Sequence, residues 1–202
     1  MKLSKSLIIL LVLLFIFENA FSQVGKRRNQ IELYGGVALP MAPDDFKDYF
    51  KTGLSLHGQY VIFPSPKLGI SFGAGYEFFT ADNDAIKEDL GIPDEVDLEV
   101  NAHITELTVG IRPYLSSSEA NTQFFLFGTG TYNLLKTEIT AKYYGEKTTE
   151  KTDEDKFGVA IGAGIEMPLG ETTNLIFQGL YRFIFTEDET TSFLGITAGV
   201  IF

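Results

Sequence analysis

Residues 68–79 read LGISFGAGYEFF, and this stretch decides the fold. Apolar and aromatic residues alternate along it with glycine, serine and glutamate. Because successive side chains of a β-strand point to opposite faces, a period of two predicts a strand with two unlike faces. One face carries the large side chains from Leu68 to Phe78, and the other carries small residues and Glu77.

Seven further segments on either side of this stretch show the same alternation. They are rich in aromatic and β-branched residues and are bounded by turn residues. A length of roughly ten residues suits a tilted strand that crosses a bilayer, whereas ordinary strands are usually nearer five or six. The segments are residues 30–39, 52–63, 100–115, 124–135, 157–167, 174–185 and 192–202.

The connections between these eight segments alternate in length. Those at residues 64–67, 116–123 and 168–173 are short, whereas those at 40–51, 80–99 and 136–156 are longer, and a shorter one at 186–191 precedes the last segment. This plan predicts an all-β, eight-stranded antiparallel up-and-down transmembrane β-barrel with both termini at the short-turn end. The Thr-rich residues 136–156 suggest strands that project beyond the membrane as a hairpin.

The first 22 residues have the features of a secretory signal peptide. Lys2 and Lys5 precede an unbroken apolar run at residues 7–17, and the small residues Ala20 and Ser22 follow it. A run of this length is too short for a spanning helix, which needs about 20 residues. We expect export through the Sec pathway and cleavage after Ser22, leaving residues 23–202 as the barrel; an uncleaved anchor is the alternative.

The composition excludes several classes of function. The chain of 202 residues has a net charge of −11 and no cysteine. A strongly acidic chain is a poor partner for nucleic acid. The lack of cysteine excludes a disulfide scaffold, a thiol nucleophile and a cysteine-ligated zinc site. We expect no cofactor.

The sizes of the two faces indicate which one contacts lipid. The interior of an eight-stranded barrel is only just wide enough for side chains to fill it, so the glycine-rich face suits the interior and the aromatic face suits lipid. A soluble, lipocalin-like barrel, in which the aromatic face lines a cavity, is the less favoured alternative. This orientation directs the following polar residues into the interior: Glu32, His57, Glu77, Glu106, Arg112, Glu166, Gln178 and Arg182.

Two interpretations of this polar interior remain open. It is a structural plug in which Arg112 and Arg182 neutralise carboxylates, or it is a narrow, porin-like path for a small solute. His57 and His103 are the only candidate catalytic bases, and no triad pattern accompanies either of them, so we predict no enzyme. The acidic residues 80–99 lack the spacing of an EF-hand, and whether they bind a divalent cation stays open.

The chain resembles the small eight-stranded outer-membrane barrel proteins of the OmpA and OmpX type, especially the outer membrane protein beta-barrel domain proteins of Bacteroidetes. The resemblance rests on the processing site at Phe21–Ser22–Gln23, the glycine-alternating strands at residues 69–79 and 158–167, and the closing strand that ends at Phe202. It implies that the barrel assembly machinery recognises that strand through Phe202 and Val200. The expected role is structural or interactive, as a monomer in outer-membrane lipid whose outer loops meet a partner.

Overall fold

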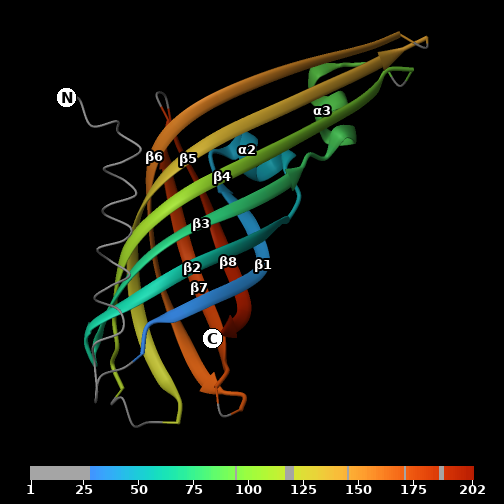
Figure 1. Cartoon of the computed structure of the whole chain (residues 1–202). Coiled ribbons are helices and arrows are strands. Elements are labelled where there is room, and N and C mark those ends of the chain that lie inside the picture. The colour runs from blue at the N-terminus through green and yellow to red at the C-terminus, as the bar shows by residue number, and fades with distance from the viewer. Residues whose placement is uncertain (1–27, 94, 117–120, 145, 171, 187–188) are drawn as a thin grey trace, which may run out of the picture.

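The computed structural model describes residues 28–202, except residues 94, 117–120, 145, 171 and 187–188. Eight strands form one closed barrel in chain order, and β8 returns to β1 (Figure 1). Every neighbouring pair is antiparallel, which confirms the predicted up-and-down barrel. The strands are β1 (Gln30–Ala42), β2 (Gly53–Ser65), β3 (Leu68–Thr80), β4 (Asp97–Pro113), β5 (Gln123–Tyr143), β6 (Glu146–Pro168), β7 (Asn174–Phe185) and β8 (Thr190–Ile201).

The barrel closes where β1 meets β8. The amide of Ile31 donates to the carbonyl of Phe202 at 3.1 Å, and the amide of Phe202 donates to the carbonyl of Ile31 at 2.9 Å. Both ends of the described chain therefore lie at the same end of the barrel. Closure leaves no exposed sheet edge within the ring, so its backbone groups are paired without help from solvent.

Large apolar side chains cover the outside of the barrel. Leu54 and Leu56 are 65% and 66% exposed, and Leu107 and Ile111 are similarly open. In a protein surrounded by water, an apolar surface that continues around the whole ring would be an aggregation hazard. No helix in the described part of the chain is long and apolar enough to cross a membrane.

Phe125 and Phe127 are among the aromatic side chains that point inward, and glycines on the neighbouring strand make room for these two rings. A Cβ atom built on Gly164 would overlap the ring of Phe125, and one on Gly162 would lie 2.5 Å from the ring of Phe127. These residues are cross-strand partners on β5 and β6. The glycine-rich face therefore admits a ring where the opposite strand lacks a side chain, while most aromatics remain outside.

The connections alternate between the two ends of the barrel, and at the end with the longer loops residues 43–52 and 81–96 are long links, whereas only two residues separate β5 from β6 and four separate β7 from β8. Only residues 66–67 join β2 to β3, and residues 114–122 and 169–173 form the other links at the short-turn end. The opposite, long-loop end contains two helices that the sequence pattern did not predict. Helix α2 (Asp44–Tyr49) follows β1, and helix α3 (Asn83–Leu90) precedes β4.

Strands β5 and β6 extend far beyond the ring and form a long hairpin (Figure 1). Their pairing continues from Gln123 opposite Glu166 to Tyr143 opposite Glu146. Residues 136–156 therefore form a projecting hairpin, as their composition suggested. The pairing of β6 with β7 begins only at Gly158, so the outer half of β6 has no strand on its other side.

Candidate functional site: the polar interior of the barrel

The eight polar residues predicted to face the interior are all buried. Seven of them belong to two separate layers of ion pairs, and each layer has one arginine at its centre. The eighth, Gln178, is 5% exposed, and its amide nitrogen has no hydrogen-bond partner within the described part of the chain. The residues are Glu32, His57, Glu77, Glu106, Arg112, Glu166, Gln178 and Arg182.

The layer nearer the short-turn end surrounds Arg112. Its guanidinium holds the carboxylate of Glu32 with two hydrogen bonds, Nη1–Oε1 at 2.5 Å and Nη2–Oε2 at 2.9 Å. Nη1 also lies 3.4 Å from Oε1 of Glu166, which accepts a second hydrogen bond from the hydroxyl of Tyr114. Gln59 donates to Oε2 of Glu32 at 2.5 Å. The two-pronged geometry fixes the orientation of the guanidinium as well as its position.

The aromatic ring of Phe125 forms part of the wall around Arg112. The guanidinium carbon lies 4.4 Å from the centre of that ring, a distance at which a cation is attracted to the π face. Arg112 is therefore held by carboxylates on one side and by a ring on the other.

The second layer surrounds Arg182 and lies nearer the long-loop end. Nη1 of Arg182 lies 2.5 Å from Oε1 of Glu77 and also contacts Oε2 of Glu106. The two ring nitrogens of His57 face these same carboxylates, Nε2 at 3.4 Å from Glu77 and Nδ1 at 3.2 Å from Glu106. The ring of Tyr34 stacks on the ring of His57, with centroids 5.0 Å apart.

The contacts of this second layer favour a structural plug. Arg182 and the two ring nitrogens of His57 all face the carboxylates of Glu77 and Glu106, so the polar groups of the layer are directed at one another. His57, Glu77 and Glu106 also bring ligand atoms within 4.8 Å of one another, a spacing that suits a metal ion. However, Arg182 already supplies a cation to both carboxylates, so these donors do not need a metal.

Sequence reasoning missed several members of the two layers. Gln59 and Tyr114 complete the layer around Arg112, and Tyr34 covers His57. Each of them lies two positions along its strand from a residue that was predicted to face the interior, as Tyr114 does from Arg112, and therefore lies on the same face. The alternation along the strand could therefore have identified them, but aromatic residues were expected mainly on the outside.

Apolar clusters close the interior on both sides of the ion-pair layers. At the long-loop end, Phe46 of α2 enters the mouth of the barrel and packs edge-on against Phe79, with ring centroids 5.0 Å apart. Phe79 in turn packs against Phe193, above Arg182. At the short-turn end, a second cluster consists of Val61, Phe63, Tyr114, Phe125, Ile176 and Ile201.

The second histidine lies outside the barrel. His103 accepts or donates one hydrogen bond with the hydroxyl of Tyr76 through Nδ1, at 2.5 Å, and its ring lies 5.1 Å from that of Phe78. The two candidate bases, His57 and His103, therefore do not share a site. Neither histidine forms part of a nucleophile–base–acid arrangement within the described residues.

The closed barrel, apolar outside and polar inside, defines a small membrane-spanning β-barrel protein. Residues 8–202 match the family described as "Outer membrane protein beta-barrel domain", and the chain belongs to that family. No curated protein matches the chain. The family places this barrel in the outer membrane, and the exposed apolar surface is therefore its lipid-facing surface.

Solved structures that share this fold include two bacterial outer-membrane proteins. A major outer membrane protein from Thermus thermophilus is 12% identical with a TM-score of 0.58, and the match covers 87% of this chain and 99% of that one. Neisserial surface protein A is 9% identical with a TM-score of 0.50, and the match covers 86% of this chain and 95% of that one. At such low identity the likeness concerns the fold alone.

Proposed function

We propose that this protein is a monomeric, non-enzymatic barrel with a closed interior, which strengthens the outer membrane and presents its long-loop end to the surroundings. One observation carries the proposal: apolar clusters lie on both sides of the ion-pair layers. A solute would have to pass Phe46 and Phe79 at one end and Phe125 and Ile176 at the other. All four are at most 8% exposed, and the charged groups between them are held in ion pairs with one another.

Conductance in planar bilayers tests the closed interior. The wild-type protein should show no discrete open states lasting milliseconds, since the ion pairs and both apolar clusters would have to separate together. A Phe46→Ala variant should also stay closed, because it removes a ring from the cluster at the long-loop end only and leaves the other cluster intact. Heat-dependent gel mobility must first show that both proteins are folded. Discrete wild-type openings would instead support the porin-like path for a small solute.

The projecting β5–β6 hairpin supports a role in surface contact. Its β6 strand consists of lysine, glutamate, aspartate and threonine over residues 146–156, so that strand is polar on both faces. Ion pairs join its strands, for example Lys151 to Glu138 at 2.9 Å. A stiff, solvated sheet of this kind holds a binding surface at a distance from the lipid, where an external partner can reach it.

The absence of cysteine makes the orientation of the barrel easy to test. A Thr148→Cys variant places one thiol on the hairpin, and a Ser65→Cys variant places one at the short-turn end. On intact cells, a membrane-impermeant maleimide should label Thr148→Cys only. Both should be labelled after the cells are broken. Labelling of Ser65→Cys alone on intact cells would invert the orientation.

Export and assembly form the last part of the proposal. The signal peptide lies outside the described residues, and the expected N-terminus of the mature protein, Gln23, can be read from its intact mass. Phe202 ends the strand that closes the ring, with an exposed side chain, and Val200 lies two residues before it on the same face. If the assembly machinery reads this strand, deletion of Phe202 should lower the amount of folded protein in the membrane more than Phe124→Ala does.

A further inference from the structure

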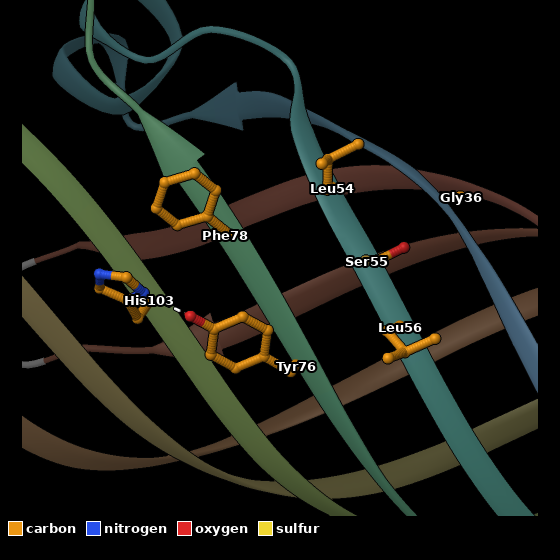
Figure 2. A pocket seen from close by; sticks show the side chains of 7 residues that line it. All are labelled: Gly36, Leu54, Ser55, Leu56, Tyr76, Phe78 and His103. Carbon is orange, nitrogen blue, oxygen red and sulfur yellow. Dashed lines mark hydrogen bonds between the residues drawn. The ribbon is translucent and has the colours of Figure 1, made fainter.

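A groove of about 650 Å³ lies on the lipid-facing surface across β2, β3 and β4. Figure 2 shows its lining: Leu54 and Leu56 from β2, Tyr76 and Phe78 from β3, and His103 from β4. The three strands are neighbours in register, with Leu54 opposite Phe78 and Phe78 opposite His103. The floor and sides are mainly apolar, which suits a hydrocarbon chain.

The Tyr76–His103 pair lies at the polar end of this groove. Tyr76 and His103 point toward one another in Figure 2, and the hydroxyl lies 2.5 Å from Nδ1. When Tyr76 donates its hydrogen to Nδ1, the proton of the neutral imidazole is on Nε2. That nitrogen points away from Tyr76 and offers a donor to a ligand.

A second groove, of about 670 Å³, begins at the same two residues and continues across β5 and β6. Its lining holds one cation, Lys136, which pairs with Glu138 at 2.9 Å, and three further carboxylates, Asp153, Glu154 and Asp155, beside Leu134 and Leu135. Lys136 is the cross-strand partner of both His103 and Asp153. The row from Phe78 to Asp153 therefore changes from apolar to charged over four strands, β3 to β6, at the boundary of the apolar surface.

We propose that the two grooves together bind one membrane lipid whose head group carries both a phosphate and a primary ammonium. Its acyl chain lies over Leu54 and Leu56. Its phosphate accepts a hydrogen bond from Nε2 of His103, and its ammonium contacts the carboxylate of Asp153, in the groove where carboxylates outnumber Lys136. A purely anionic head group fits less well, because Asp153 and Asp155 would repel it.

Quenching of a single tryptophan by brominated lipid tests this proposal, because the natural chain contains no tryptophan. Ala74→Trp places the reporter on the outer face of β3, two residues before Tyr76. Ala163→Trp is the matched control, on β6 beside an apolar groove that has no histidine or tyrosine among its lining residues. The folded proteins are placed in phosphatidylcholine vesicles with a fixed fraction of brominated phosphatidylethanolamine, phosphatidylglycerol or phosphatidylcholine.

We expect Ala74→Trp to report a relative affinity for phosphatidylethanolamine about fivefold above that for phosphatidylcholine. This ratio corresponds to the net binding free energy of about one hydrogen bond. Ala163→Trp should show no preference. Adding His103→Phe should remove the preference for phosphatidylethanolamine, and adding Asp153→Asn should let phosphatidylglycerol compete equally. Equal quenching by all three lipids at Ala74→Trp, or a preference that survives His103→Phe in a folded barrel, would overturn the proposal.

Discussion

Arg112 and Glu32 join two strands that are not neighbours, across the interior of the barrel. Arg112 is on β4 and Glu32 is on β1, and two hydrogen bonds of 2.5 and 2.9 Å connect their side chains. Both residues are at most 2% exposed. The pair therefore ties opposite walls of the ring in a place that water does not reach, where the loss of one partner leaves the other uncompensated.

The first prediction concerns the loss of this cation. Arg112→Met should lower the free energy of unfolding by about 3–5 kcal/mol, because Glu32 and Glu166 lose the buried cation that balances their charge. Urea titration of the refolded protein in detergent, followed by circular dichroism, measures the change. A loss below about 1 kcal/mol would contradict a structural role for the pair.

A double-variant cycle separates lost packing from unpaired charge. Arg112→Met combined with Glu32→Gln should recover part of the stability, since one of the two carboxylates that Arg112 balanced has been removed. Glu138→Gln is a matched control, because Glu138 contacts only exposed lysines, Lys136 and Lys151. Its loss should cost less than about 1 kcal/mol.

The order and faces of the strands were predictable because they depend on local alternation. A period of two at residues 68–79 sets which side chain points inward, and eight such segments with alternating turns specify the ring. The partners of each charge were not predictable. Whether Arg112 reaches Glu32 or Glu106 depends on strand tilt and stagger, which no single segment encodes.

The helices were missed, and the alternation marked only the inner parts of β5 and β6, for a different reason. Helix α2 has one buried side chain, Phe46, among acidic residues, and it is held by contacts with the barrel mouth rather than by its own sequence. Helix α3 did carry a local signal, since Gly91 ends it in the left-handed conformation. The outer part of β6 is exposed on both faces and carries polar residues only, so apolar alternation could not mark this hairpin.

The second prediction is a pH-dependent link between the two helices. The hydroxyl of Tyr49 donates to Asp89 at 2.6 Å, and this hydrogen bond, together with the nearby negative charge, raises the pKa of Tyr49 to about 12. Because this value is above the ordinary value of about 10, the link is complete below about pH 10 and is lost as the pH rises through about 12.

Ultraviolet absorbance of tyrosinate measures this titration. Subtraction of the Tyr49→Phe curve from the wild-type curve isolates one residue, and its midpoint should lie near pH 12. Asp89→Asn should move the midpoint down toward about 10, because the neutral amide no longer repels the phenolate. A wild-type midpoint at the ordinary value would mean that the helices do not meet in solution.

The third prediction is that the outer hairpin can be removed without unfolding the barrel. Glu138 and Lys151 are cross-strand partners, so an Asn-Gly turn can replace residues 139–150 between them. The deleted residues pair with one another and with the outer end of β4 only. The free energy of unfolding should change by less than about 1 kcal/mol, because local units of this kind open independently.

Heat-dependent gel mobility and urea titration check the shortened protein. If the shortened protein still migrates faster without boiling, the ring of strands is sufficient for a stable fold. Failure of the shortened chain to refold would show instead that the hairpin is needed to assemble the strands. In that case its role would extend beyond the presentation of a surface.

The fourth prediction concerns the space that Gly75 leaves for the layer around Arg182. A Cβ atom at this position would overlap Nδ1 of His57 and would lie 2.8 Å from Oε1 of Glu106. Gly75→Ala should therefore displace His57 and lower the free energy of unfolding by about 1–3 kcal/mol. Gly128→Ala is the control, because no atom lies within 4 Å of its added carbon.

The cause of that loss can be tested in the same layer. If Gly75→Ala acts by crowding His57, then truncating the ring with His57→Ala should relieve the clash. The double variant should then lose less stability than the two single variants together. If the losses simply add, the cost of Gly75→Ala comes from the backbone of β3, and the close approach of His57 to Glu106 does not contribute to stability.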